Sequence, residues 1–293
     1  MSRLLCGALV LACAVGCRSD RAGGANEGNA SRTTPASAPG PGAQAPASEA
    51  AQGDKPAARP DPDLARDQDE YVEDVMAFAH STREQVRERM KLGSDPLKDE
   101  WNTWEKQGPM TPERITAFYK QTTNYIYELA EWHLFVSSKR ESDLALFDNM
   151  RAKQPRNILD FGGGVGLLAI PLARAGFDVT LADLDSTTLR FAAFRAERHN
   201  VKLKIWKSDV EPAPPDAKYD VIMCMDVLEH LPRDILHDVV DKLVKLKHAG
   251  TRIIISAPFG RTAVHPMHLD LSEDTKQQVR RLRDELPPDA AAK

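Results

Sequence analysis

A glycine-rich stretch near the middle of the chain carries the clearest chemical signal. Residues 157–166 read NILDFGGGVG, an apolar run and an acid followed by four glycines within five residues. Gly162, Gly164 and Gly166 permit a tight turn and close approach of a ligand, and a helix that follows would offer its N-terminal amides. Because Gly164–Ala169 also fits the dinucleotide pattern G-x-G-x-x-G/A, the stretch predicts a nucleotide site and leaves the nucleotide open.

The acids near this stretch favour a nucleotide that carries positive charge. Asp160 stands immediately before the glycines, where its carboxylate would repel a pyrophosphate but attract the ammonium and sulfonium groups of S-adenosylmethionine. Asp183, 17 residues after Gly166, can accept hydrogen bonds from both ribose hydroxyls, as an acid does in NAD sites. Asp185 is an alternative for this role, although its place just before Ser186 and the next helix suits a helix cap equally.

Polar side chains that follow two later apolar runs form a candidate catalytic group. Asp226, Glu229 and His230 are spaced i, i+3 and i+4, so on a helical turn they would face one direction. His265 and His268 follow the last predicted strand, at the edge of the sheet where α/β sites form. An oxygen nucleophile is helped by a base or a metal ion that removes its proton. We therefore expect a catalytic group of His230, Glu229 and His268.

Three roles remain open for this group. In the first, Glu229 and His230 bind a divalent ion such as Mg²⁺ together with His265, His268 or both. In the second, a histidine acts as a general base without a metal. In the third, the Glu-His pair only shapes the nucleotide pocket.

Alternating strand and helix patterns must position these residues. The predicted strands cover residues 157–161, 178–184, 201–206, 219–225 and 251–257, and the predicted helices cover 165–175, 187–198, 233–247 and 273–285. Because parallel strands are joined by right-handed crossovers, this order predicts an α/β fold with a Rossmann-like parallel sheet. The carboxyl ends of its strands then carry the glycines, the acids and the histidines to one edge.

Residues 63–150 predict an N-terminal helical cap. Val72, Val75 and Met76 follow helical spacing, and Thr111 with Pro112 reads as a helix start. Aromatic rings are frequent here, and they either line a substrate pocket or simply pack the cap: Tyr119, Tyr125, Tyr127, Trp132, His133 and Phe135.

The first 62 residues differ in composition from the rest. Residues 1–17 hold an apolar run from Leu4 to Gly16 and small residues before Cys17, which resembles a bacterial lipoprotein signal with Cys17 or Cys13 as the lipidated residue. Residues 18–62, rich in Ala, Pro, Gly and Ser, predict a disordered linker. We expect a lipid-anchored membrane protein, or a cytoplasmic one if the start codon is misassigned. Cys224 alone follows the leader, so no disulfide is expected in the fold.

Four segments together resemble the motifs of class I S-adenosylmethionine-dependent methyltransferases. They are ILDFGGGVGLLAIPLARAGFDVTLADLD, SDVE, YDVIMCMDVLEHL and LVKLKHAGTRIIISAPF, between Asn157 and Phe259. The DVLEHL motif with a later histidine is similar to the group that includes ubiquinone-biosynthesis O-methyltransferases and small-RNA 2′-O-methyltransferases. The resemblance implies a methyltransferase domain over residues 151–293, in which the last two strands of the family are not evident.

The resemblance also implies how the donor binds. Asp160 and residues 162–166 would hold the methionine end, Asp183 would bind the ribose, and Leu184 would pack on adenine. Asp209, a solvated loop residue in the alternative interpretation, would read the adenine edge with the amide of Val210. Asp226, at the end of the fourth predicted strand, also belongs to the donor site.

These observations predict an S-adenosylmethionine-dependent methyltransferase that acts on a small-molecule acceptor, with oxygen as the expected nucleophile. The net charge of −4 and the lack of an arginine-rich face disfavour a nucleic acid substrate. An NAD-dependent oxidoreductase is disfavoured because Asp160 and the Glu-His pair have no role in it. The main alternative is a non-catalytic ligand-binding or scaffold lipoprotein on a methyltransferase fold, because an exported protein would meet little S-adenosylmethionine.

Overall fold

The computed structural model describes residues 64–214 and 217–287. The predicted leader over residues 1–17 and the predicted linker over residues 18–62 lie outside the described residues. Among the residues that are described, no helix is both long enough and apolar enough to cross a membrane.

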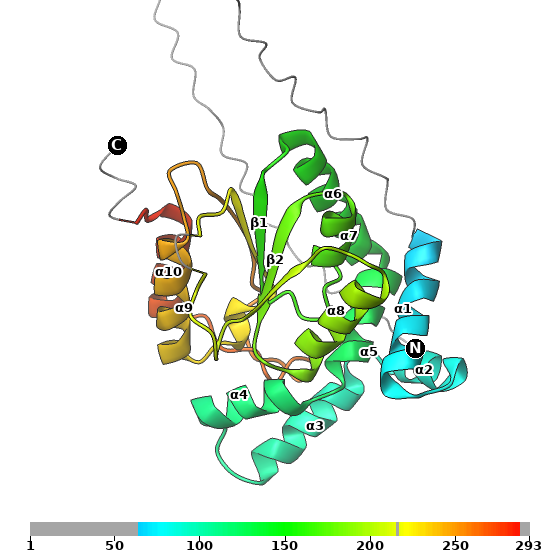
Figure 1. Ribbon diagram of the computed structural model, residues 1–293. Helices are drawn as coiled ribbons and strands as arrows, with labels where there is room; N and C mark the ends of the chain where they lie inside the picture. The colour runs from blue at the N-terminus through cyan, green and yellow to red at the C-terminus, as the bar shows by residue number, and fades with distance from the viewer. Residues whose placement is uncertain (1–63, 215–216, 288–293) are drawn as a thin grey trace, which may run out of the picture. The chain divides into compact units, whose positions relative to one another are not determined.

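Five parallel strands form one sheet, as the sequence predicts (Figure 1). Their order is β3-β2-β1-β4-β5. Strands β2 and β3 extend the sheet to one side of β1, and the chain then crosses back to place β4 and β5 on its other side. The strands are β1 (Asn157–Phe161), β2 (Asp178–Asp183), β3 (Lys204–Lys207), β4 (Val221–Met225) and β5 (Arg252–Ser256). In α/β proteins ligands bind at such a switch point, outside the carboxyl ends of the strands. The switch point here is where the glycines follow β1 and Asp226 follows β4.

Apolar side chains of the central strands form part of a hydrophobic core on each face of the sheet. Ile158 packs with Phe147 and Met150, whereas its neighbour Leu159 packs on the opposite face with Leu243 and Leu282. α9 and α10 cover one face, and α6, α7 and α8 cover the other (Figure 1). These helices are α6 (Ser137–Lys153), α7 (Ala169–Arg174), α8 (Thr187–Arg198), α9 (Arg233–Lys245) and α10 (Glu273–Asp284).

Most predicted bounds shift by one or two residues, and two elements begin three or more residues later than predicted. The helix predicted over 165–175 begins only at Ala169, because residues 165–168 continue the turn of the glycine loop. The third strand covers Lys204–Lys207 rather than residues 201–206, since only these residues pair with β2. In the described residues α10 follows β5 with no further strand between them.

The predicted cap is helical throughout. It consists of α1 (Leu64–Ala79), α2 (Arg83–Lys91), α3 (Asp95–Lys106), α4 (Pro112–Gln121), α5 (Tyr125–Ala130), a π-helical turn η1 (Glu131–Phe135) and α6. Tyr71 of α1 packs against Phe191 of α8 with ring centroids 5.5 Å apart, and Trp101 of α3 packs against Phe118 of α4 at 5.0 Å. α6 differs from the other cap helices because Phe147 belongs to the core of the sheet. α3 and α4 lie across one end of the sheet (Figure 1).

Candidate active site

The glycine loop between β1 and α7 has the tight backbone that its sequence predicts. Gly162, Gly164 and Gly166 all adopt positive φ angles, of 73°, 52° and 77°. A Cβ on Gly162 would lie 2.3 Å from Cγ2 of Val227, so the loop also lies close against the segment that follows β4. Conformation favours glycine at all three positions, and at Gly162 space requires it as well.

Asp160 is a buried acid that lacks a full set of partners. Its side chain is 2% exposed, and Oδ2 has no hydrogen-bond partner among the described residues. Burial, together with the nearby charge of Asp183, raises the pKa of Asp160 to about 7, and the ammonium of Lys139 opposes this shift. A buried carboxylate oxygen without a partner costs free energy, so the site favours a ligand that brings a donor or a positive charge.

Asp183 forms a hydrogen bond with the glycine loop, besides its predicted role in ribose binding. Its Oδ2 accepts from the amide of Gly164 at 2.8 Å, and its Oδ1 accepts from the amide of Leu184 at 2.7 Å. Burial raises the pKa of Asp183 to about 6 even though both amides lower it. Since each carboxylate oxygen has two lone pairs, ribose hydroxyls can still bind, but the contact with Gly164 was not evident from sequence.

Asp209, the acid predicted to bind adenine, already forms an ion pair with the cap. Asp209 accepts from the amide of Asp185 at 2.8 Å and pairs with Lys120 of α4 at 2.6 Å. Burial raises the pKa of Asp209, but these bonds outweigh it and lower the pKa overall. Val210 is exposed, but its amide, predicted to read adenine, already donates to the carbonyl of Lys207 at 3.2 Å. An adenine amino group would therefore share Asp209 with Lys120.

The alternative role of Asp185 as a helix cap is taken by its neighbour. Ser186 precedes α8, and its Oγ accepts from the amide of Leu189 at 3.2 Å. The carboxylate of Asp185 instead lies 3.6 Å from the side chains of Arg190 and Lys207. Asp183 is left as the acid that faces the glycine loop.

Asp226, Glu229 and His230 do not share a regular helical turn. Asp226 has a φ of 57°, its amide donates to the carbonyl of Ser256, and its Oδ1 accepts from Oγ of Ser256 at 2.6 Å. Glu229 and His230 follow on a short 3₁₀ turn, η2 (Leu228–His230). The spacing predicted one face for all three, but the left-handed residue and its bonds to β5 tie Asp226 to the neighbouring strand.

Glu229, His230 and His268 come together, as the sequence predicts. Potential ligand atoms of these three residues lie within 4.8 Å of one another. Glu229 is fully buried, and neither of its carboxylate oxygens has a partner among the described residues; burial and the nearby Asp226 raise its pKa to about 8. His265 stacks on His268 with ring centroids 4.6 Å apart but lies outside the three-residue cluster of ligand atoms.

His230 is oriented from the cap. Its Nδ1 lies 2.9 Å from the hydroxyl of Tyr119 in α4, and its ring centroid lies 4.8 Å from that of His268. Burial, followed by the charges of His268 and His265, lowers the pKa of His230 to about 3. The imidazole is therefore neutral at physiological pH, which suits either a metal ligand or a proton acceptor.

The remaining predicted aromatic residues divide between core and surface. Tyr127 is buried in the core shared by α1, α2 and α5, whereas Tyr125 packs beside Tyr119 with ring centroids 5.9 Å apart. Trp132 and Phe135 are exposed. Only Tyr119 and Tyr125 among these tyrosines therefore border the histidine cluster.

Sequence reasoning missed Glu128 of α5. One of its carboxylate oxygens is buried without a partner among the described residues, and burial, Glu131 and Asp226 raise its pKa to about 7. The signal in the sequence was an acid within a short apolar helix between Tyr127 and Ala130, both of which are buried. That pattern alone does not show which way the acid points.

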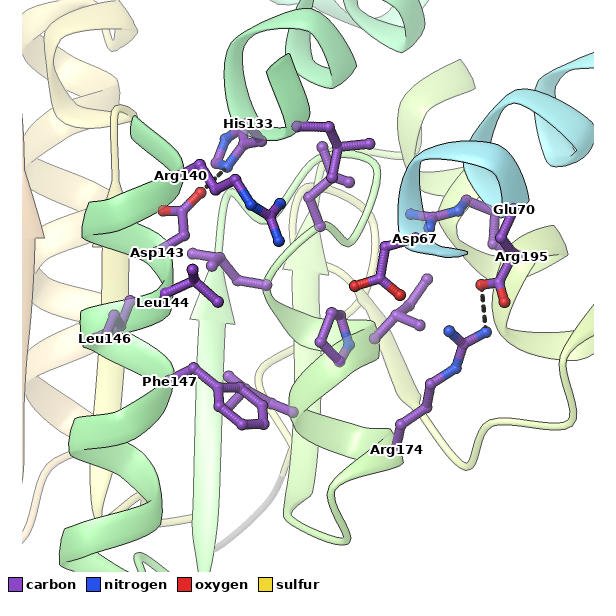
Figure 2. Close-up of a pocket in the computed structure, with 16 residues that line it drawn as sticks. Asp67, Glu70, His133, Arg140, Asp143, Leu144, Leu146, Phe147, Arg174 and Arg195 are labelled. Atoms are coloured by element: carbon purple, nitrogen blue, oxygen red, sulfur yellow. Dashed lines mark hydrogen bonds and ion pairs between the residues drawn. The ribbon is translucent and has the colours of Figure 1, made fainter. Parts of the chain in front are cut away.

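A hollow is lined in part by the two leucines that follow the last glycine of the loop. Figure 2 shows it between α1, η1, α6 and α7, with Arg140 directed into it. Other charged groups on its walls are paired, including Glu70 with Arg174 and His133 with Asp143 at 2.7 Å. It contains none of the residues predicted to bind the donor or to act in catalysis.

Comparison with known proteins extends the similarity into the cap. A family model described as a methyltransferase domain matches residues 124–286. The ubiquinone biosynthesis O-methyltransferase of Rickettsia akari is 39% identical over 98 residues, 33% of this chain and 38% of that protein. That of Paramagnetospirillum magneticum is 35% identical over 114 residues, 39% of this chain and 45% of that protein. The match thus spans less than half the length of either relative.

A solved structure shows a looser similarity over a longer part of the chain. An O-methyltransferase family protein from Burkholderia thailandensis is 14% identical, with a TM-score of 0.47 over 67% of this chain and 65% of that one.

Proposed function

Because the chain belongs to the methyltransferase-domain family, we propose that it transfers a methyl group from S-adenosylmethionine to a hydroxyl oxygen of a small molecule. The observation that carries this proposal is the set of buried acids around the glycine loop. Asp160 has an oxygen without a partner among the described residues, directly before a loop that can admit a nucleotide. A donor with an ammonium and a sulfonium supplies the positive charge that this position lacks.

The chain offers a contact for each part of the donor. Asp160 and the glycine loop would hold the methionine end, Asp183 the ribose and Leu184 one face of adenine. Asp209 would accept from the adenine amino group while it keeps its bond to Lys120. When bound, the donor supplies a methyl group made electrophilic by the adjacent sulfonium, so the protein acts mainly by positioning and by removing a proton.

His230 is the residue that we propose to receive the acceptor's proton. In the tautomer that this role needs, Nδ1–H donates to the hydroxyl oxygen of Tyr119, which leaves Nε2 unprotonated and available to the acceptor hydroxyl. As that proton moves to Nε2, the acceptor oxygen bonds to the methyl carbon, and the electron pair of the broken carbon–sulfur bond stays on sulfur. The low pKa of His230 makes it a weak base, so activation of the hydroxyl by a metal ion is the alternative; His230 would then bind the ion through Nε2 and would not take the proton.

A divalent ion fits the same cluster. Glu229 offers two buried oxygens without partners, and His230 and His268 are neutral because burial lowers their pKa values. An ion held by these three residues would lower the pKa of an acceptor hydroxyl. Two imidazoles with one carboxylate suit Fe²⁺ or Zn²⁺ better than the Mg²⁺ suggested by sequence.

Calorimetric titration of the purified chain tests donor binding first. S-adenosylmethionine should bind with micromolar affinity and NAD should not. Asp183→Ala should weaken binding by tenfold or more, because it removes both the ribose contact and the acceptor for the amide of Gly164. Asp178→Ala is the matched control, since Asp178 stands exposed at the opposite end of the same strand.

Each outcome of the titration has a clear meaning. Binding of NAD in place of S-adenosylmethionine would favour an oxidoreductase. Absence of binding for both would contradict the proposed function and favour a ligand-binding or scaffold protein on a methyltransferase fold.

A further inference from the structure

Glu128 is a partly buried acid of the cap whose surroundings are acidic. Its Oε2 is buried without a hydrogen-bond partner among the described residues. The ionisable groups that face it are Glu131 of η1, Asp226 after β4, and the tyrosines Tyr71 of α1 and Tyr125 of α5. None of these groups can neutralise a carboxylate. An acid in such a place is stable when ionised only if a cation joins it.

The position of α5 shows where that cation would come from. A Cβ on Gly164 would lie 3.0 Å from Cδ1 of Leu129, the residue next to Glu128, so α5 lies directly on the glycine loop. Asp226 follows β4, which pairs with β1 in the sheet, so it stands beside the same loop. Glu128 is therefore near both structures that form the switch point.

We propose that Glu128 is a further ligand of the methyl donor, and that it faces the cationic methionine end from the cap, opposite Asp160 and Asp226. This inference rests on the proposed function. It makes the cap part of the donor site, whereas the sequence suggested only a role in the acceptor pocket.

The charge of the donor is what Glu128 would recognise. S-adenosylmethionine carries a sulfonium and an ammonium, whereas S-adenosylhomocysteine, the product left after transfer, keeps only the ammonium. Extra negative charge near the sulfur therefore favours the donor over the product. Because burial holds the pKa of Glu128 near 7 without ligand, a cation that lowers this pKa should expel a fraction of a proton at neutral pH.

The test is calorimetry with the full chain at pH 7 in phosphate and in Tris buffer, whose ionisation enthalpies differ. Wild type and Glu128→Gln are each titrated with S-adenosylmethionine and S-adenosylhomocysteine. Glu141→Gln is the matched control, because Glu141 is exposed on α6. We expect Glu128→Gln to weaken donor binding about tenfold and to release fewer protons on binding than wild type does. The protons that the variant still releases come from Asp160, whose pKa is also raised.

The two ligands separate the possible contacts. A loss confined to S-adenosylmethionine supports a contact with the sulfonium, and an equal loss for both ligands supports a contact with the ammonium. Unchanged affinity and unchanged proton release in Glu128→Gln would overturn the inference. If wild type binds neither ligand, the proposed function itself fails, which is a different result.

A melting curve separates binding from folding. Glu128→Gln removes a carboxyl whose Oε2 is buried without a partner among the described residues, so the ligand-free variant should melt at the same temperature as wild type or higher. A lower melting temperature with weaker binding would mean that Glu128 supports the fold, and would also overturn the inference.

Discussion

At the scale of single residues, the residues proposed to bind the donor differ from those proposed to help remove the acceptor's proton, which are Glu229, His230 and His268. The proposed donor contacts lie on the glycine loop and β2, whereas proton removal is proposed for the histidines near Tyr119 of the cap. His230→Ala and His268→Ala should therefore reduce methyl transfer by about 100-fold or more, while donor affinity changes less than threefold. Transfer is measured with a methyl-labelled donor and a panel of phenols and catechols.

The control for this prediction is His237→Ala. His237 lies on α9, where it contacts Asp274 at 2.9 Å, and it takes no part in the cluster. Normal turnover in both His230→Ala and His268→Ala would remove these histidines from the mechanism.

Metal binding by the same residues can be measured without turnover. After incubation with Fe²⁺ or Zn²⁺ and removal of free ions, wild type should retain about one ion per chain by elemental analysis, since the cluster offers three ligands. Glu229→Gln should retain little, because it replaces a carboxylate with a neutral amide. Equal retention by wild type and variant would show that the ion binds elsewhere.

At the scale of elements, one buried acid joins α1 to α8. Asp74 of α1 is fully buried and binds Arg195, Arg198 and His199, at 3.1, 3.1 and 2.7 Å. Arg195 also donates to the carbonyl of Val165, so this junction supports the end of the glycine loop. Cap and donor site are therefore joined through side chains that are distant in sequence.

Asp74→Ala should lower the free energy of unfolding by about 3 kcal/mol or more, because it leaves buried Arg195 without its carboxylate. The measurement is unfolding in urea. Asp69→Ala is the matched control on the same helix, since Asp69 forms only exposed pairs with Arg83 and Arg87 and should change stability by less than about 1 kcal/mol. Similar losses in both variants would contradict a special role for Asp74.

At the scale of the whole molecule, the buried acids make stability depend on pH. The pKa values of Asp160, Asp183 and Glu128 are raised to about 7, 6 and 7 in the folded chain, from ordinary values of 3.8, 3.8 and 4.5. Between pH 4 and pH 7 these carboxyls, together with Glu229 at about 8, hold more protons in the folded than in the unfolded state, and they outnumber His230, whose pKa is lowered from 6.5 to about 3 and which acts in the opposite direction. Their contribution to stability is present below pH 4 and is lost as pH rises through the folded values.

Without ligand, the chain should melt at a lower temperature at pH 8 than at pH 5. Each group contributes at most about 1.4 kcal/mol per pH unit within its window. Asp160→Asn should reduce this pH dependence, and saturating S-adenosylmethionine should raise the melting temperature more at pH 8 than at pH 5, since the donor binds the ionised acids. A melting temperature that is the same in wild type at both pH values would contradict the assigned shifts.

The sequence by itself determined the strands, the glycine turn and the order of elements, because these depend on residues that are close together along the chain. The apolar runs predicted all five strands, and the glycines predicted a turn whose backbone no larger residue fits. The order of strands and helices then predicted the parallel sheet and the edge that carries the site. The motif around His230 also predicted that His265, His268 or both would approach it, and His268 does.

Only the tertiary structure decided what depends on partners far away in sequence. The hydroxyl of Tyr119 reaches His230 across 111 residues, and Lys120 reaches Asp209 across 89. The sequence contains no local pattern for either contact, because each is created by the packing of the cap on the sheet. Glu128 is the strongest case, since an acid in a helix normally faces water and only the fold turns this one toward Asp226.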